Sequence, residues 1–224
     1  MQIGDEHFAA LRREMIEIIA VHTVLAGDQT GRRVLGDRVI EAMGRVPRHE
    51  FVPVELRAFA YNDHPLPIGY DKTISQPFMV ALMTDLLDIR EGESVLEVGT
   101  GLGYQAAVLA EIAARVYSIE IIEELAEEAG RRLKTLGYAN VEIRLGDGSR
   151  GWPEFAPFDK VIVTAAPELI PPLLLAQLAS GGRMIIPAGI ADDQKLMLVE
   201  KGADDKIRTR ELLPVRFTPL VTSH

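Results

Sequence analysis

Cysteine is absent from the 224-residue sequence. This absence excludes disulfide bonds, thiolate metal sites and cysteine nucleophiles, and it makes the cytoplasm the expected location. The sequence also lacks an apolar run of about 18 residues, the length that a transmembrane helix needs. Residues 1–17 carry acidic and basic side chains and lack the apolar centre of a signal peptide. We therefore expect no membrane partner.

Basic residues are fewer than acidic ones. Lysine and arginine total 24, aspartate and glutamate total 33, and the formal net charge is -9. A protein that wraps nucleic acid needs a basic face, so we expect no nucleic-acid partner. The five histidines show no spacing typical of metal ligands, and we expect no metal site. A Gly-x-Ser-x-Gly motif and a phosphate-cradling lysine after a glycine loop are absent as well.

The sequence does contain a glycine-rich turn between a strand and a helix. Residues 95–104 read Val-Leu-Glu-Val-Gly-Thr-Gly-Leu-Gly-Tyr and run on into a segment of helical composition. Glycines in such a turn let a ligand approach the backbone. A dinucleotide fingerprint places its third glycine one residue later, where Tyr104 stands here, and Glu97 precedes the turn. The pattern favours a ligand with a cationic amino-acid end, such as S-adenosylmethionine; a purely structural connection is the alternative.

Strand and helix patterns alternate from about residue 94 onward. We expect strands over 94–99, 115–120, 141–145, 160–165 and 183–187, and helices over 104–114, 122–136 and 172–178. Such alternation is typical of an α/β fold with a parallel sheet and helices on both faces. We take Gly181-Gly182 as the punctuation after the last of these helices. Residues 195–201 and 207–217 then predict a C-terminal antiparallel hairpin.

The first 90 residues do not show this alternation of strand and helix patterns. Residues 8–25, 34–43 and 78–87 show helical patterns, and a proline-rich loop region lies between the last two. We expect one domain over residues 1–224, in which an N-terminal helical and loop cap (1–90) covers a cofactor-binding core (91–224). We expect a monomer.

Acidic residues follow three successive predicted strands: Glu97, Glu120 and Asp147. In a doubly wound sheet, ligands bind at these strand ends. Glu120 stands 17 positions after Gly103, close to the roughly 20-residue spacing of an acid that binds ribose hydroxyls. Asp147 lies between two glycines and could accept a hydrogen bond from an adenine amine. One such acid alone would read as a helix cap or a solvated charge; three together favour a nucleoside site.

The residue types that the sequence lacks exclude several kinds of methyl acceptor. Cytosine C5 methylation needs a cysteine, and residues 164–167, Thr-Ala-Ala-Pro, offer no aromatic side chain to stack a flipped base. No histidine stands in the cofactor loops to deprotonate a hydroxyl. A carboxylate acceptor needs no base, because catalysis then reduces to alignment and desolvation. The Ser75 hydroxyl, assisted by Thr73, could orient it; an ordinary helix N-cap is the alternative role for Ser75.

Several blocks of the sequence resemble the protein-L-isoaspartate O-methyltransferase family. They are residues 46–53, 66–69, 73–77, 95–104, 146–148, 181–183 and 215–217. The resemblance implies a Rossmann-like methyltransferase fold with a mostly parallel seven-stranded sheet. It implies transfer of a methyl group from S-adenosyl-L-methionine to the free carboxyl of isoaspartyl residues in damaged proteins and peptides, with S-adenosyl-L-homocysteine as product. The ester then collapses to a succinimide, and hydrolysis restores some aspartate.

The resemblance also implies roles for individual residues. Ser75 is the expected catalytic residue, and it would bind the substrate together with Val215, Arg216 and Phe217. The expected cofactor-binding residues are Thr73, Ile74, Gln76, Glu97, Gly99, Thr100, Gly101, Glu120, Ile121, Asp147 and Gly148. The chain departs from the family pattern at Asp71-Lys72, at Phe78 and Val80, and at Val221. Methylation of a small-molecule carboxylate and a non-catalytic adaptor that binds isoaspartyl peptides remain as alternatives.

Overall fold

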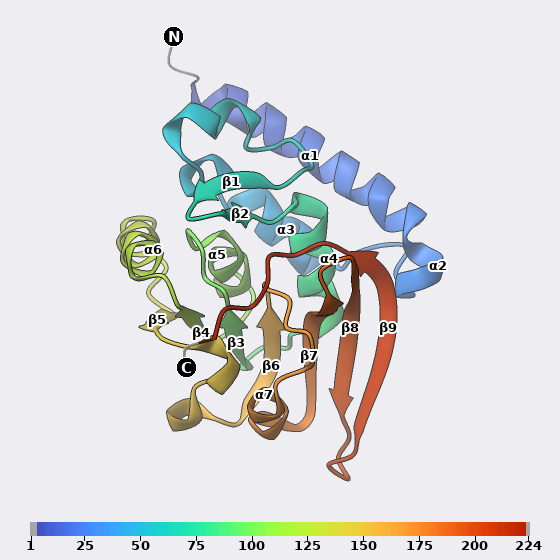
Figure 1. The fold of residues 1–224 in the computed structure, drawn as a ribbon. Helices are drawn as coiled ribbons and strands as arrows, with labels where there is room; N and C mark the ends of the chain where they lie inside the picture. The colour runs from blue at the N-terminus through green and yellow to red at the C-terminus, as the bar shows by residue number, and fades with distance from the viewer. Residues whose placement is uncertain (1–3, 223–224) are drawn as a thin grey trace.

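Seven strands form the central sheet of the protein, whose computed structural model describes residues 4–222 (Figure 1). The strands are β3 (Ser94–Val98), β4 (Arg115–Glu120), β5 (Val141–Leu145), β6 (Phe158–Val163), β7 (Leu178–Ile190), β8 (Asp193–Lys201) and β9 (Ile207–Val215). Their order is β5-β4-β3-β6-β7-β8-β9; β3 to β7 pair in parallel, and β8 and β9 are antiparallel. The predicted α/β sheet with its C-terminal hairpin is confirmed.

The order of the strands reverses between β3 and β6. Chain order runs outward from β3 to β5 on one side and from β6 to β9 on the other. At such a switch point the loops that follow the two strands diverge and leave a crevice for a ligand. The predicted glycine turn follows β3 and therefore lies at this crevice.

Strand β7 is longer than the sequence pattern predicts. It begins at Leu178, so Gly181-Gly182 lies inside the strand and does not punctuate the preceding helix. The pairing with β6 shifts register between Phe158 and Lys160. A Cβ on Gly182 would lie 2.9 Å from the Asp159 carbonyl oxygen, so the glycine permits a close approach of two backbones.

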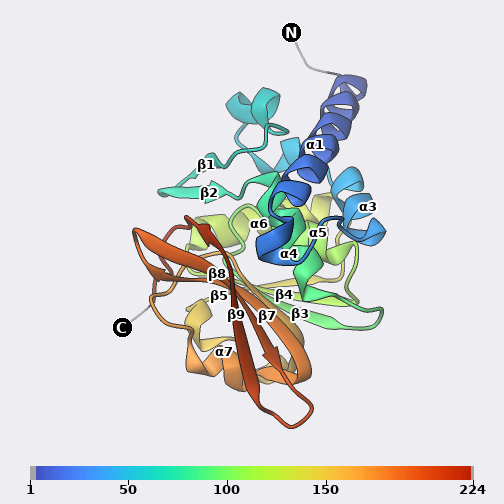
Figure 2. The same ribbon diagram turned by 90° about the vertical axis from the view of Figure 1, so that its right-hand side faces the viewer.

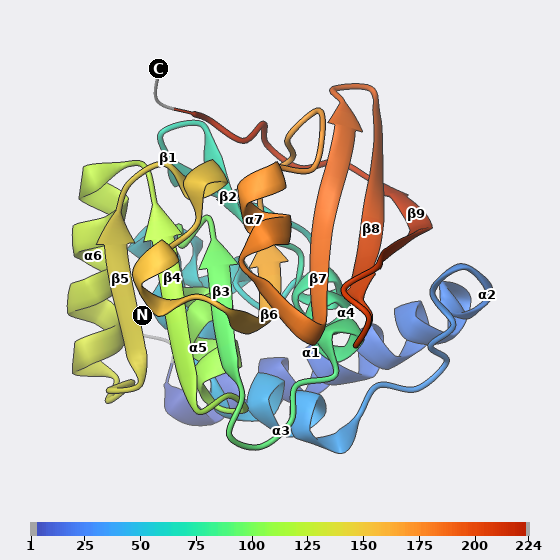
Figure 3. The same cartoon turned by 90° about the horizontal axis from the view of Figure 1, so that it is seen from below.

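Helices cover both faces of the sheet, as predicted. On one face lie α4 (Pro77–Leu87), α5 (Tyr104–Ala110) and α6 (Glu123–Thr135); on the other lies the short α7 (Pro172–Ala176) with the loops beside it (Figure 3). Helix α5 ends at Ala110, four residues before the end of the helix predicted over 104–114. Alternating strand residues divide between two apolar clusters, with Val95 facing α4 and α5 and Leu96 facing α7.

The N-terminal part forms the cap. It consists of α1 (Asp5–Leu25), α2 (Gly27–Thr30), α3 (Asp37–Arg45), two 3₁₀ turns (Arg48–Phe51 and Val54–Phe59) and a hairpin of β1 (Leu66–Gly69) and β2 (Lys72–Ile74) (Figure 2). The sequence pattern predicts only loop where the hairpin forms, because Pro65 and Pro67 interrupt it. Met15 of α1 belongs to the same apolar cluster as Val95 of the sheet, so cap and core share one interior.

The chain after β9 returns across the carboxyl ends of the central strands (Figure 1). It is held there at Ala166, whose N–H donates to the Thr218 carbonyl (2.8 Å) and whose carbonyl accepts from Leu220 N–H (2.9 Å). Residues 218–221 thereby cover the loop that follows β6.

Candidate active site

The glycine turn after β3 has no room for side chains. Gly99, Gly101 and Gly103 have φ values of 98°, 56° and 94°, in the left-handed region that glycine adopts without strain. A Cβ on Gly99 would lie 2.4 Å from Thr164 Oγ1, and that hydroxyl donates to the Gly99 carbonyl (2.7 Å). The turn is thus fixed against the end of β6, with its backbone open to the crevice.

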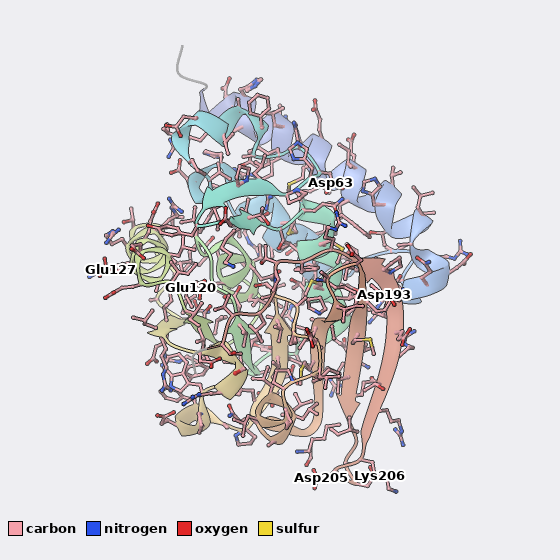
Figure 4. The ribbon with its side chains drawn as sticks, in the orientation of Figure 1. Asp63, Glu120, Glu127, Asp193, Asp205 and Lys206 are labelled. Atoms are coloured by element: carbon pink, nitrogen blue, oxygen red, sulfur yellow. The ribbon has the colours of Figure 1, made fainter. Side chains whose placement is uncertain are left out.

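Glu120 connects the glycine turn to the end of β4. Its carboxylate accepts hydrogen bonds from the backbone N–H groups of Gly101 (2.7 Å), Ile121 (2.9 Å) and Ile122 (3.1 Å), and the residue is 6% exposed. Figure 4 shows it at the carboxyl edge of the sheet, on the side of α6. Each carboxylate oxygen has two lone pairs, so capacity remains for the hydroxyls of a ribose.

Two small cavities adjoin the turn, with volumes of about 70 and 40 Å³. Most of the residues predicted to bind the cofactor line one or both of them: Thr73, Ile74, Gly99, Thr100, Gly101, Glu120, Ile121 and Gly148. The walls also contain residues that sequence reasoning did not assign to the cofactor: Ile68 and Lys72 of the hairpin, Thr164 and Ala165 after β6, and residues 218–221. The predicted set is therefore brought together at the carboxyl end of the sheet.

Gln76, Glu97 and Asp147 are placed differently from the other predicted cofactor residues, since none of the three is among the described residues that line these cavities. Asp147 caps the 3₁₀ turn Gly148–Arg150 and accepts from Ser149 N–H (2.9 Å) and Oγ–H (2.7 Å). The adjacent Gly148 lies directly against β3, because a Cβ there would be 2.3 Å from Val98 Cγ1.

Glu97 is fully buried beneath the glycine turn. Ser118 donates a hydrogen bond to Glu97 Oε2, and Ser118 Oγ lies 2.6 Å from Thr100 Oγ1. Glu97 Oε1 has no hydrogen-bond partner within the described residues. Burial raises the pKa of Glu97 to about 8, so the side chain is mostly neutral at pH 7.

Ser75 lies between β2 and α4 with a hydroxyl that has no hydrogen-bond partner within residues 4–222. The N-cap alternative for Ser75 is wrong, because α4 begins at Pro77 and its cap position is Gln76. The free N–H of Phe78 in the first turn is bound instead by Asp63 Oδ1 (2.8 Å). The Ser75 hydroxyl is thus available to a ligand.

A buried arginine holds the backbone of Ser75. Arg48 is fully buried, donates from Nη2 to the Ser75 carbonyl (2.7 Å) and from Nε to the Ala60 carbonyl (2.7 Å), and lies over the Tyr104 ring at 4.7 Å. Burial lowers the pKa of Arg48 to about 10, which leaves it charged at neutral pH. The residue stands within the recognised block 46–53, but nothing in the block indicated this contact.

Asp63 holds the next residues of the same loop (Figure 4). Its Oδ2 accepts from Gln76 Nε2 (2.8 Å) and lies 2.5 Å from His22 Nδ1 of α1. Sequence reasoning missed Asp63, since it lies in a loop region without periodic pattern and its partners are distant in the chain.

A larger groove, of about 870 Å³, opens beside Ser75. Val215, Arg216 and Phe217, the predicted substrate wall, line one side of it; α1 and α2 line the other, and Gln76 also contacts it. Ser75, Thr73 and Thr164 line both the groove and the cavity at the glycine turn. Among the described lining residues there is no carboxylate, and the ionisable ones are His22 and Arg216. The junction of the two spaces therefore suits a negatively charged acceptor.

The wall at Phe217 is fixed by a buried amide. Gln194, 4% exposed, accepts from Phe217 N–H at Oε1 (2.7 Å) and donates from Nε2 to the Phe217 carbonyl (3.1 Å). This contact was not predicted, because it joins β8 to a segment 23 residues later.

The described part of the chain contains no group of three or more histidine, aspartate or glutamate side chains that could hold a metal ion. Across residues 4–222, no helix combines the length and the apolar character needed to cross a membrane.

The fold and the site together define a class. A doubly wound sheet with a glycine turn at its switch point, an acid at the next strand end and no phosphate-cradling lysine is typical of Rossmann-like methyltransferases. The family "Protein-L-isoaspartate(D-aspartate) O-methyltransferase (PCMT)" matches residues 21–224. The chain belongs to this family.

Proteins of this family are similar in sequence to the chain over nearly its whole length. A protein-L-isoaspartate O-methyltransferase of Polaromonas sp. is 61% identical over 216 residues, which cover 96% of this chain and 92% of that protein. One of Syntrophobacter fumaroxidans is 56% identical over 222 residues, covering 99% and 90%. Membership of the family confirms the predicted resemblance, the predicted O-methyltransferase activity on isoaspartyl residues and the predicted methyl donor, S-adenosylmethionine.

Two solved structures have the same fold as this chain. A protein-L-isoaspartate O-methyltransferase superposes with a TM-score of 0.79 at 30% identity; the match covers 93% of this chain and 65% of that longer chain. A Plasmodium falciparum protein, described as a beta-aspartate methyltransferase in complex with S-adenosyl-L-homocysteine, gives a TM-score of 0.77 at 22% identity and covers 95% and 99%. At that identity the second likeness shows the fold alone.

Proposed function

We propose that the protein methylates the free carboxyl of isoaspartyl residues in damaged proteins and peptides, with Ser75 as the residue that orients the acceptor. One observation carries this proposal. The unpartnered Ser75 hydroxyl lies where the cavity at the glycine turn meets a groove that has no carboxylate among its described lining residues.

The residues present suit S-adenosylmethionine. Gly99 and Gly148 are positions where a Cβ would meet neighbouring side chains, so the backbone there is bare. Glu120 and Ile121 would hold the ribose, and Asp147 with Gly148 the adenine. The methionine end would lie against Ile74, Thr100 and Gly101, above Glu97. When bound, this donor supplies a methyl group on a positively charged sulfur; an acceptor oxygen forms the new C–O bond as the S–CH₃ bond breaks.

Each protein group has a limited part in this reaction. Ser75 donates a hydrogen bond to one carboxylate oxygen of the acceptor and leaves the other oxygen to react. Arg48 fixes the carbonyl of Ser75, and its buried positive charge favours an anion nearby. No side chain needs to remove a proton, because the acceptor is already ionised at neutral pH. Catalysis is therefore alignment and desolvation.

Val215, Arg216 and Phe217 form the wall against which the substrate peptide lies, and Gln194 keeps that wall in place. We further propose a cytoplasmic monomer made of one domain, with cap 1–90 and core 91–224, that binds neither nucleic acid nor membranes. The lack of cysteine, the net charge of -9 and the shared interior of cap and core support these points.

The test uses two synthetic peptides that differ only in an isoaspartyl or an ordinary aspartyl linkage. With labelled S-adenosylmethionine, we expect methyl transfer and later methanol release from the isoaspartyl peptide only. Equal labelling of both peptides would contradict the proposal. Labelling of a small carboxylic acid that the isoaspartyl peptide cannot compete away would favour the small-molecule alternative.

A further inference from the structure

The N-terminal helix exposes apolar side chains that its own packing does not use. Ile18, Val21 and Leu25 are 40%, 58% and 76% exposed. Their spacing places them on one face of α1 together with His22. The adjoining face of the helix already packs into the interior through Met15, which is fully buried. The exposed stripe is therefore additional to what holds α1 on the protein.

This stripe is continuous with the groove beside Ser75. Leu25 and His22 line the groove from the α1 side, and the partly buried Val215 and Phe217 line it from the opposite side. Figure 1 shows the end of α1 and the short α2 above the tips of β8 and β9, where the two walls face each other. Apolar side chains thus line the groove from both sides, beside the Ser75 hydroxyl.

We propose that the α1 stripe, centred on Leu25, binds an apolar side chain that flanks the isoaspartyl residue in the substrate. This inference rests on the proposed function, which places the modified residue at Ser75. The junction at Ser75, which has no carboxylate among its described lining residues, receives the isoaspartyl carboxylate. The walls of the groove receive the side chains that flank it. Apolar side chains are mostly buried in folded proteins. A site for them therefore selects segments that damage has unfolded.

The experiment compares isoaspartyl peptides that carry either leucine or serine at one of the four positions on each side of the modified residue. For the wild-type protein, we expect leucine to raise kcat/KM roughly tenfold over serine at one or more positions, since a hydrophobic pocket discriminates by about that factor. Leu25→Ser should reduce this ratio to about one.

Val24→Ser is the matched control. Val24 is 53% exposed on the same helix, but unlike Leu25 it is not among the residues that line the groove. This variant should keep the wild-type preference for leucine. A wild-type protein that does not distinguish leucine from serine at any position contradicts the subsite, as does an equal loss of preference in both variants. Absence of methyl transfer to every peptide contradicts the proposed function itself.

Discussion

Ser75 is held by its backbone and left free at its side chain. Arg48 binds the Ser75 carbonyl at 2.7 Å, and Asp63 accepts from Gln76 and Phe78, while the Ser75 hydroxyl has no partner in the described chain. A serine kept for structure would show the reverse, with its hydroxyl bonded to backbone, as at an N-cap. The arrangement agrees with a hydroxyl reserved for the acceptor.

Ser75→Ala should therefore lower turnover far more than it lowers cofactor affinity. Loss of one positioned hydrogen bond to the reacting group costs roughly 10²-fold in kcat. We expect a fall of about that size for an isoaspartyl peptide, with the Kd for S-adenosylhomocysteine within about twofold of the wild type. Label transfer and calorimetry measure the two quantities. Equal losses in both would make the serine a structural residue.

Glu97 should make the stability of the protein depend on pH. Its pKa is about 8 in the folded protein because of burial, above the 4.5 of an exposed carboxyl. The folded state therefore binds more protons than the unfolded state between these values. The free energy of unfolding should fall as pH rises from about 4.5 to 8, by an amount on the order of a few kcal/mol.

Glu97→Gln is the variant that isolates this effect, because glutamine stays neutral throughout. Urea unfolding at several pH values between 5 and 8 should give a clearly shallower slope for the variant. The variant's absolute stability is not the readout, since its amide group adds a donor that needs a partner. Parallel slopes for the two proteins would show that Glu97 does not titrate in this range.

At the scale of elements, the small β1–β2 hairpin lines the cavities at the glycine turn. It pairs at only three positions, Leu66 with Ile74, Pro67 with Thr73 and Gly69 with Lys72, and it is not joined to the main sheet. A two-stranded hairpin has little stability of its own. The cavities of about 70 and 40 Å³ are smaller than the roughly 300–1,000 Å³ typical of ligand pockets. Binding should therefore move the hairpin outward and then fix it in place.

Hydrogen exchange tests this expectation. Without ligand, the amides of residues 66–74 should exchange much faster than those of β3 and β4. Saturating S-adenosylhomocysteine should slow exchange in the hairpin by about tenfold or more, since the open form becomes rarer. Unchanged exchange in residues 66–74 on ligand binding would mean that the hairpin takes no part.

The elements that the sequence predicted best are those whose signal is local. Strand β3 is a mostly apolar run bounded by turns, β5 alternates apolar and charged residues, and the glycine turn is recognisable from its composition. The β1–β2 hairpin was not predicted, because Pro65 and Pro67 interrupt its strand pattern. Its pairing depends on packing under the cap. Asp63 could not be found either: its role depends on His22 and on Gln76, which only the folded chain brings near. Contacts between residues this far apart in the sequence leave no periodic pattern in it.

At the scale of the whole molecule, the cap and the sheet share one apolar interior. Helix α1 packs on α4, α4 packs on the sheet, and one apolar cluster runs from Met15 to Leu198. The proposed active site lies across the same boundary, with Ser75 from the cap and Gly99 and Glu120 from the core. A cap that opened independently would disassemble the junction between the groove and the cavity.

Unfolding should accordingly be a single transition. The one tryptophan, Trp152, lies in the apolar cluster on the α7 face of the sheet, away from the cap, so its fluorescence reports the core. Far-ultraviolet circular dichroism reports largely the helices, of which α1 is the longest in the described chain. We expect the two signals to change together with temperature. S-adenosylhomocysteine should raise both midpoints equally, because it binds only the assembled site. A circular-dichroism transition that precedes the change in fluorescence would show instead that the cap melts alone, and the proposal of one domain would then fail.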